Sequence, residues 1–200
     1  MATLNGLKVA ILVAEGFEQA ELTEPRKALD QAGAATSVVS PAKGEVQGWK
    51  HFEKADKVKV DVPLEQANAS EFDALLLPGG VANPDQLRTQ PKAVAFVKAF
   101  FEARKPVAAI CHGPWTLIEA GVVDGRTMTS WPSLQTDLRN AGANWVDQEV
   151  VVDNGLVSSR KPADIPAFNQ KMIEEFAEGR HARQAPRAQQ QPGRSSPARH

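Results

Sequence analysis

The feature that most constrains this fold is a series of short apolar runs, each stopped by a polar or glycine-containing turn. Runs of this length are typical of buried strands, and they cover residues 8–14, 35–40, 73–77 and 107–110. Apolar residues at helical spacing predict helices at residues 92–103, 115–120, 134–140 and 167–177, and residues 25–32 form the end of another helix. Because strands alternate with helices, we predict an α/β protein, a three-layer α/β/α sandwich around a mostly parallel sheet.

Two further regions extend the predicted sheet. Residues 58–62 alternate apolar and polar side chains and stop at Pro63, which indicates a half-exposed strand after a loop or hairpin. Residues 150–152 and 156–158 flank the turn Asp153-Asn154-Gly155, which predicts two paired strands.

Length and composition predict one folded domain and a tail. With 200 residues, 42% of them hydrophobic, the chain can bury one sizeable core, and we place this domain at residues 1–179. Residues 180–200 contain five arginines and no acid, with almost no large apolar side chain. Such a segment cannot offset its ordering entropy by burial, so we expect a disordered basic tail.

The charge balance argues against several functions for the folded body. Of the 23 lysines and arginines, 18 lie before the tail against 24 acids, so the body carries about −6 and offers no basic face for nucleic acid. Apolar runs are too short to span a membrane. The single cysteine excludes an intramolecular disulfide, and residues 1–6 lack a signal-peptide pattern, so we expect a cytoplasmic protein.

That single cysteine, Cys111, lies where a nucleophile is expected. It follows the apolar run 107–110 and precedes His112-Gly113-Pro114, and Pro114 suits the first position of a helix. A strand-to-helix turn lifts a side chain to the edge of a sheet, where the positive end of the helix favours thiolate over thiol. The alternative is a small cysteine packed in the core.

Two other turns should lie at the same sheet edge, because ligands of open α/β sheets bind beyond the carboxyl ends of the strands. One is Pro78-Gly79-Gly80, and the other is the loop after Ala14, which carries carboxylates at positions 15, 18 and 21. A carboxyl group beside a thiolate has its pKa raised and can donate a hydrogen bond to sulfur. The same acids could instead only complement a helix dipole.

The histidines narrow the chemistry further. His112 is the only one placed for catalysis, since His51 lies in a charged loop and the other two lie in or near the tail. No His-x-Glu pair follows Cys111, which argues against the triad of glutamine amidotransferases. One cysteine and dispersed histidines make no zinc site, so we expect no metal.

Four segments together resemble the PfpI family of intracellular peptidases and bacterial general-stress proteins. These are residues 15–22 (EGFEQAEL), 77–80 (LPGG), 109–114 (AICHGP) and 157–164 (VSSRKPAD). The family belongs to the superfamily of the parkinsonism-associated protein deglycase, and the resemblance covers residues 7 to about 178. It implies a flavodoxin-like, class I glutamine amidotransferase-like fold.

The resemblance also implies roles for individual residues. Cys111 would be the nucleophile and Glu21 the carboxyl group bonded to its sulfur, with Glu18 as a nearby alternative. His112 would assist proton transfer. The backbone N–H groups of Gly80 and His112 would hold a developing oxyanion. In the peptidase branch an acid of a neighbouring subunit orients the histidine, and the matching residue is Asp85, which could alternatively cap a short helix.

Other residues are candidates for the wall of the pocket. Gly79 and Trp131 should lie near the thiol, whereas Trp115 could line the mouth or pack in the core, and packing is favoured. Arg160 could bind a carboxylate, although a structural salt bridge is the simpler expectation.

The leading hypothesis is a cofactor-independent stress-response hydrolase of the glyoxalase or protein deglycase type. Its partners would be a small carbonyl compound such as methylglyoxal, or a glycated protein or peptide, and we expect a homodimer or higher homo-oligomer. The folded body is not expected to bind nucleic acid, and no membrane is expected as a partner. The alternatives are a cysteine peptidase that acts on small peptides and a redox sensor or chaperone in which Cys111 is oxidised without turnover.

Overall fold

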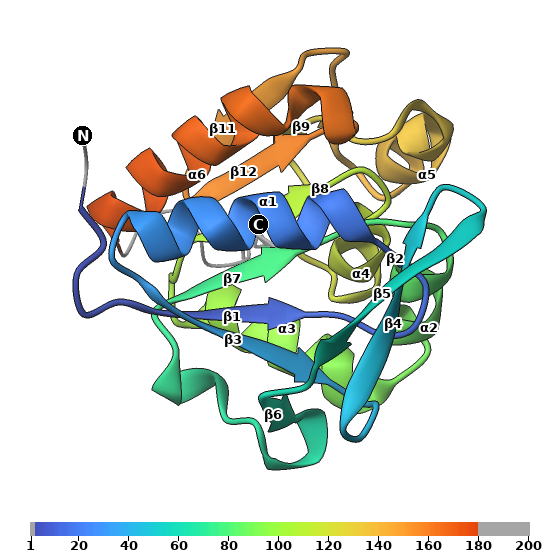
Figure 1. The fold of residues 1–200 in the computed structure, drawn as a ribbon. Helices are drawn as coiled ribbons and strands as arrows, with labels where there is room; N and C mark the ends of the chain where they lie inside the picture. The colour runs from blue at the N-terminus through green and yellow to red at the C-terminus, as the bar shows by residue number, and fades with distance from the viewer. Residues whose placement is uncertain (1–2, 180–200) are drawn as a thin grey trace, which may run out of the picture.

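A computed structural model describes residues 3–179 of the chain. Its largest sheet has seven strands in the order β11-β12-β8-β7-β1-β3-β6, and its neighbouring strands are parallel except for β11 and β12 (Figure 1). The strands are β1 (Lys8–Leu12), β3 (Ala35–Ser40), β6 (Val62–Pro63), β7 (Ala74–Leu77), β8 (Val107–Ile110), β11 (Val150–Asp153) and β12 (Leu156–Ser159). The predicted α/β architecture with a mostly parallel sheet is confirmed.

Helices cover both faces of this sheet. Figure 1 shows α1 and α6 in front of the strands and α3 behind them. The helices are α1 (Gln19–Gln31), α2 (Ala82–Arg88), α3 (Pro91–Glu102), α4 (Pro114–Glu119), α5 (Gln135–Asn140) and α6 (Ile165–Glu178). Short 3₁₀ turns cover Leu64–Gln66, Ala69–Glu71, Pro132–Leu134 and Pro162–Asp164.

Two hydrophobic cores explain why the central strands are apolar throughout. In β1, Val9 and Ile11 pack with apolar residues of α1 and α6, whereas Ala10 and Leu12 pack with those of α3. A strand buried on both faces shows a continuous apolar run rather than alternation. This burial holds the central strands as a rigid base for the loops at their ends.

A second, smaller sheet stands beside the main one. It consists of β2 (Phe17–Glu18), β4 (Glu45–Lys50) and β5 (Glu53–Lys59), in which β4 and β5 form an antiparallel hairpin (Figure 1). The prediction of one strand over 58–62 is therefore wrong in part, because this segment divides between β5 and β6. The short parallel pair β9 (Thr127–Met128) and β10 (Asn144–Trp145) was not anticipated either.

The first helix begins earlier than its pattern suggested. α1 starts at Gln19 and carries Pro25 inside it, so Glu21 lies in the first helical turn rather than in a loop. The predicted helices at 92–103, 115–120, 134–140 and 167–177 are confirmed to within two residues at each end. Within residues 3–179, no helix is long and apolar enough to cross a membrane. The predicted disordered tail lies outside the described residues.

Candidate functional site

The topology brings the three predicted turns together at one edge of the sheet. β1, β7 and β8 are consecutive neighbours and run parallel. Their carboxyl ends therefore place the loop after Ala14, the Pro78-Gly79-Gly80 turn and Cys111 side by side.

Cys111 occupies a constrained strand-to-helix elbow. Its φ of 61° lies in the left-handed region, which a residue with a side chain rarely adopts. Its N–H donates to Ser159 O at 3.0 Å, and its carbonyl accepts from Trp131 N–H at 2.9 Å. Pro114 begins α4 directly afterwards, as predicted. Two neighbouring segments thus fix the elbow that presents the thiol.

Glu21 reaches the elbow from α1 and is completely buried. Its Oε2 accepts a hydrogen bond from Gly79 N–H at 2.8 Å. Within residues 3–179, no donor or acceptor lies in hydrogen-bonding geometry to its Oε1. Gly79 separates the acid from the cysteine, since a Cβ on Gly79 would lie 2.5 Å from Glu21 Oε2 and 2.6 Å from Cys111 Cβ. Only glycine fits at position 79.

Burial decides the protonation state of this acid. Loss of solvent raises the pKa of Glu21 to about 8, against the lowering effect of its hydrogen bonds to Cys111 and Gly79. Glu21 is therefore protonated at neutral pH and can donate to the Cys111 sulfur. Burial also raises the pKa of the Cys111 thiol, and the negative charge of an ionised Glu21 raises it further. A protonated Glu21 removes that second cause, so the neutral acid favours the thiolate more than the carboxylate does.

His112 also contacts the sulfur. Its Nδ1 is 3.2 Å from Cys111 Sγ, and its Nε2 is 3.4 Å from the Ser133 hydroxyl oxygen. Burial lowers the pKa of His112 to about 4, so the ring is neutral near pH 7 and can accept a proton. The adjacent acid and base that the sequence predicted therefore flank the thiol.

Two backbone N–H groups also face the sulfur. Hydrogen bonds from the backbones of Gly80 and His112 favour the Cys111 thiolate. Gly80 adopts a φ of 76°, and a Cβ there would collide with the carbonyl oxygen of Gly16. The two N–H groups that the resemblance assigns as oxyanion donors thus lie beside the Cys111 sulfur, and the position of the first depends on glycine at residue 80.

Asn83 supports this arrangement, although sequence reasoning did not single it out. It is fully buried; its side chain accepts from Ala14 N–H at 2.7 Å and donates to the carbonyls of Pro78 and Gly79 at 3.0 and 2.9 Å. One amide thus ties the end of β1 to the turn after β7. In the sequence the residue is marked only by its place three residues after the Gly-Gly turn.

A cavity of about 340 Å³ opens above the thiol. Its floor includes Cys111, His112, Glu21 and Gly80, and its mouth is lined by Glu18, His51, Phe52, Val81, Trp131 and Pro162. Such a volume lies at the small end of ligand pockets. Trp131 takes the predicted place in the wall, and Gly79 lies beneath the cavity, between the acid and the thiol.

The hairpin of β4 and β5 supplies one side of the mouth, which sequence reasoning missed. Its tip is His51-Phe52, and Glu18 Oε2 accepts from His51 N–H at 3.0 Å. Glu18 therefore holds the hairpin tip in place while it faces the cavity. We expected His51 in a charged loop away from the site. It lies instead at the tip of the β4–β5 hairpin, which brings it to the mouth of the cavity, and no sequence motif indicates that path.

Three other candidates lie outside the cavity in this chain. Trp115 packs edge-on against His112 with the ring centroids 5.2 Å apart, and its Nε1 donates to Asp137 at 2.9 Å. Asp85 lies inside α2 rather than at its N-cap, and it pairs with Arg88 at 2.9 Å. Arg160 forms ion pairs with Asp147 and Asp164 at 2.7 and 2.8 Å, which is the structural role expected of it.

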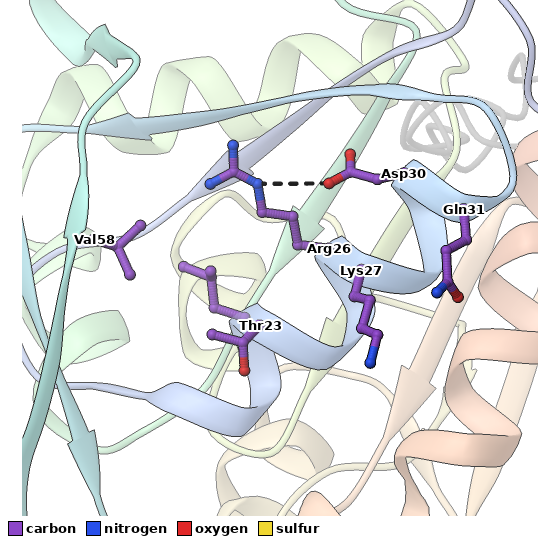
Figure 2. Close-up of a pocket in the computed structure, with 7 residues that line it drawn as sticks. Thr23, Arg26, Lys27, Asp30, Gln31 and Val58 are labelled. Carbon is purple, nitrogen blue, oxygen red and sulfur yellow. Dashed lines mark ion pairs between the residues drawn. The ribbon is translucent and has the colours of Figure 1, made fainter.

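A second, larger groove of about 470 Å³ lies between α1 and β5 and lacks comparable chemistry. Figure 2 shows its lining, in which Arg26 points toward Asp30 from the same helix. Arg26 also donates to Asp61 at 3.3 Å and to Thr36 at 3.1 Å, so its charge is already paired. Within residues 3–179, no three His, Cys, Asp or Glu side chains converge as a metal site would require.

The fold and the site together define a class of protein. The chain is a flavodoxin-like α/β sandwich with a cysteine at a strand-to-helix elbow and a buried carboxyl group beside the thiol. The particular family follows from sequence comparison. The chain belongs to the DJ-1/PfpI family, whose family model matches residues 7–175.

Several relatives are similar over most of their length. The chain is 47% identical over 169 residues to general stress protein 18 of Bacillus subtilis, covering 84% of this chain and 96% of the relative. It is 46% identical over 167 residues to deglycase TK1284 of Thermococcus kodakarensis, covering 84% and 98%.

A solved structure of similar fold comes from Anabaena variabilis. This protein contains DJ-1/ThiJ/PfpI-like and ferritin-like domains, and the chain is 36% identical to it with a TM-score of 0.79. The match covers 84% of this chain and 49% of that protein, so the chain spans about half of the two-domain protein.

Proposed function

We propose that this chain is a cofactor-independent glyoxalase or deglycase that acts on methylglyoxal or its adducts through Cys111. The observation that carries the proposal is the convergence of a thiol, a protonated carboxyl group and a neutral imidazole in one small cavity. The names of the relatives, a general stress protein and a deglycase, support a stress-related, hydrolytic role.

The first step is addition of sulfur to the aldehyde. The S–H bond of Cys111 breaks, its proton passes to His112 Nδ1, and the sulfur lone pair forms a C–S bond with the carbonyl carbon. The carbonyl oxygen gains negative charge, and the N–H groups of Gly80 and His112 stabilise it. Return of the proton to this oxygen gives a hemithioacetal.

The second step moves a proton between the two carbons of the adduct. His112 removes the proton from the sulfur-bearing carbon and delivers it to the neighbouring carbon, while the hydroxyl proton on the sulfur-bearing carbon passes to the former ketone oxygen. The hemithioacetal thus becomes a lactate thioester. Water then cleaves the thioester, so lactate leaves and the thiol is restored. Methylglyoxal and water thus give lactate, with no net oxidation and no cofactor. For a glycated amine in its carbinolamine form, the sulfur instead displaces the amine: the C–S bond forms as the C–N bond breaks, and the thiol proton passes through His112 to the leaving nitrogen. The unmodified amine leaves, and the same hemithioacetal remains on Cys111.

The decisive experiment compares wild type with Cys111→Ser on three substrates in one series: methylglyoxal, a glycated peptide and a fluorogenic peptide. We expect wild type to convert the first two and Cys111→Ser to lose at least a hundredfold in kcat/KM. Full turnover of methylglyoxal by Cys111→Ser would refute the mechanism.

Cysteine peptidase activity is the second candidate, and the 3.2 Å approach of His112 Nδ1 to Cys111 Sγ favours it. A thiol with a neighbouring imidazole is the pair that acyl transfer requires. Cleavage of the fluorogenic peptide in the same series, without conversion of methylglyoxal, would establish it instead. Oxidation of Cys111 by peroxide with no turnover of any substrate would indicate the third role, a redox sensor.

A further inference from the structure

The Glu18 carboxylate places an unbalanced charge in the Cys111 cavity. Glu18 lines the mouth, and its side chain is only 11% exposed. The other acid of the lining, Glu21, is protonated at neutral pH, and the ring of His112 is neutral. Among residues 3–179, no lysine or arginine lines the cavity. A negative charge therefore stands at the mouth without a lysine or arginine of the lining to neutralise it.

We infer that Glu18 is a specificity-determining residue, which makes the cavity admit neutral or positively charged carbonyl compounds in preference to negatively charged ones. The inference rests on the proposed function for the reaction at Cys111, and it adds the charge of the preferred substrate. An α-oxo acid, or an adduct flanked by acidic residues, would be disfavoured. An adduct flanked by basic residues would be favoured.

The backbone holds the Glu18 carboxylate in this place. Its Oε2 accepts from His51 N–H at 3.0 Å, and Glu18 N–H donates to Gly79 O at 3.4 Å. Helix α1 begins at the next residue, so the positive end of the helix stabilises negative charge here. The partial charge of a helix end offsets only part of a full carboxylate charge. The acid is thus fixed between the hairpin tip and the turn that supports the floor.

The charge of Glu18 also acts on the reacting groups. Burial is the largest cause of the raised pKa of Glu21, and the negative charge of Glu18 raises it further. Charges that are shielded from water interact more strongly than charges on an open surface. The N–H groups of Gly80 and His112 favour negative charge at the sulfur, and so act on the reacting atoms rather than at the mouth. A substrate between the mouth and the sulfur therefore lies in the field of Glu18.

Two aromatic side chains at the mouth act in the same direction. Phe52 is 94% exposed and Trp131 is 38% exposed, and both line the cavity. The face of an aromatic ring carries partial negative charge and attracts cations. The mouth thus combines a carboxylate with two rings, and all three favour a positively charged group over a negatively charged one.

The basic residues near the mouth do not remove this charge. Arg160 is already paired with two aspartates, and Lys50 and Lys161 are exposed and lie outside the lining. His51 Nδ1 lies 4.0 Å from Glu18 Oε2, so a protonated His51 would weaken the effect. The experiment is therefore run at pH 7.5, about one unit above the ordinary pKa of a histidine.

The test compares two thiol reagents of similar size and opposite charge, 2-(trimethylammonium)ethyl methanethiosulfonate and 2-sulfonatoethyl methanethiosulfonate. The Cys111 sulfur forms an S–S bond with the reagent, the S–S bond of the reagent breaks, and methanesulfinate leaves with the electron pair while the thiol proton passes to water. Because Cys111 is the only cysteine, intact mass reports its reaction alone. Each rate is divided by the rate of the same reagent with 2-mercaptoethanol. A change in thiol nucleophilicity then cancels in the ratio of the two rates.

Wild type should react about tenfold faster with the cation than with the anion. Added NaCl at about 0.5 M should reduce this preference, because salt screens charges but not steric effects. Glu18→Gln keeps an oxygen that can accept from His51 N–H, and its ratio should be close to one. Alkylation by the neutral reagent iodoacetamide checks that the thiol of each variant still reacts.

Glu15→Gln is the matched control. Glu15 is exposed, accepts from Gln47 N–H of the same hairpin at 2.9 Å, and does not line the cavity. Removal of this charge should leave the wild-type ratio. The inference would be overturned by a wild-type ratio near one, by a preference that salt does not reduce, by a wild-type ratio in Glu18→Gln, or by an equal drop in Glu15→Gln.

The substrate measurement uses one glycated peptide flanked either by lysines or by glutamates. Wild type should favour the lysine form in kcat/KM by about threefold to tenfold, and Glu18→Gln should not. Equal kcat/KM for the two peptides in wild type would also overturn the inference. Failure of wild type to convert either peptide or methylglyoxal would refute only the proposed function, because the reagent ratio requires no substrate.

Discussion

The floor and the mouth of the Cys111 cavity differ in almost every physical property. The floor is buried and polar: Glu21 is 0% exposed and Cys111 6% exposed, and both contact glycines that tolerate no side chain. The mouth includes Glu18 and His51, but its large exposed side chains are apolar: Phe52 is 94%, Val81 58% and Trp131 38% exposed. Only one other large hydrophobic residue of the described chain, Val152, is comparably exposed.

This difference suggests separate roles, in which the floor supports the reaction and the mouth selects the substrate. A reacting group requires fixed neighbours and a low-dielectric setting, so its surroundings permit few substitutions. Exposed apolar side chains at the mouth, which we also call the rim, contribute little to folding and are therefore free to contact a substrate. We therefore expect changes in the floor to abolish reactivity and changes in the rim to alter preference among substrates.

The largest effect is expected for Gly79→Ala, which breaks the floor. The new methyl group would lie 2.5 Å from Glu21 Oε2 and 2.6 Å from Cys111 Cβ, so the acid and the thiol must move apart. We expect alkylation of Cys111 and turnover of methylglyoxal to fall by at least a hundredfold. The free energy of unfolding, measured by urea titration, should fall by about 1–3 kcal/mol.

Gly121→Ala is the matched control for this change. A Cβ at Gly121 meets no atom within 4 Å, although its φ of 69° is unfavourable for alanine. This variant should lose about 1 kcal/mol of stability and keep full reactivity. Equal losses of activity in both variants would mean that Gly79→Ala acts through global destabilisation.

The next effect concerns the protonated acid of the floor. The folded-state pKa of Glu21 is about 8, well above its ordinary value of 4.5, so the folded protein binds this proton more tightly than the unfolded chain does. The contribution of Glu21 to the free energy of unfolding is therefore fully present at low pH. It is lost as the pH rises from about 4.5 to 8, by up to ~1.4 kcal/mol per pH unit.

Glu21→Gln removes this titration and keeps a hydrogen-bond donor beside the sulfur. The stability of Glu21→Gln relative to wild type should therefore increase with pH up to about 8 and then stay constant. His112, whose lowered pKa penalises acid pH, is present in both proteins and cancels in the comparison. Urea titrations from pH 5 to 9 measure this difference, and a difference that does not change with pH would contradict a buried neutral Glu21.

The floor was largely predictable from the sequence, because short-range patterns specify it. An apolar run followed by Cys111 and Pro114 predicts the elbow, and the parallel order of strands brings the Gly-Gly turn beside it. The position of Glu21 was predicted only in part. α1 starts earlier than the pattern suggested and contains Pro25, and the contacts of this helix with the sheet outweigh the weak local preference.

The mouth of the cavity was predictable only in part: Trp131 and Glu18 were expected near the thiol, whereas the hairpin tip was not. His51 and Phe52 reach the cavity only because a hairpin of a particular length bends over Glu18, and no local rule specifies that path. Asn83 was missed for a similar reason, since its side chain accepts a hydrogen bond from the distant Ala14 N–H as well as donating to the nearby carbonyls of Pro78 and Gly79. Contacts that depend on how separate segments meet cannot be found from periodicity.

A smaller effect is expected at the rim, where Phe52→Ala tests whether this side chain helps to select among substrates. The cavity of about 340 Å³ has room for roughly ten non-hydrogen atoms, about twice the number in methylglyoxal. A larger aromatic dicarbonyl such as phenylglyoxal should therefore extend to the mouth. Loss of the Phe52 ring should lower kcat/KM for phenylglyoxal by about threefold to tenfold and leave that for methylglyoxal unchanged. Val152→Ala, an exposed apolar residue on β11, is the control. Parallel losses for both substrates would place Phe52 in the chemistry instead.

The smallest effect is expected for Asp85→Asn. Asp85 and Arg88 form an exposed pair within one helix, which contributes at most about 0.5 kcal/mol, so the unfolding midpoint should hardly move. Turnover of methylglyoxal should also be unchanged, because the floor contains its own acid and base. Peptide cleavage is the sensitive measurement: a loss greater than tenfold, in a protein shown by sedimentation to be oligomeric, would mean that Asp85 acts on His112 of another subunit. The floor would then be sufficient for carbonyl addition but not for acyl transfer.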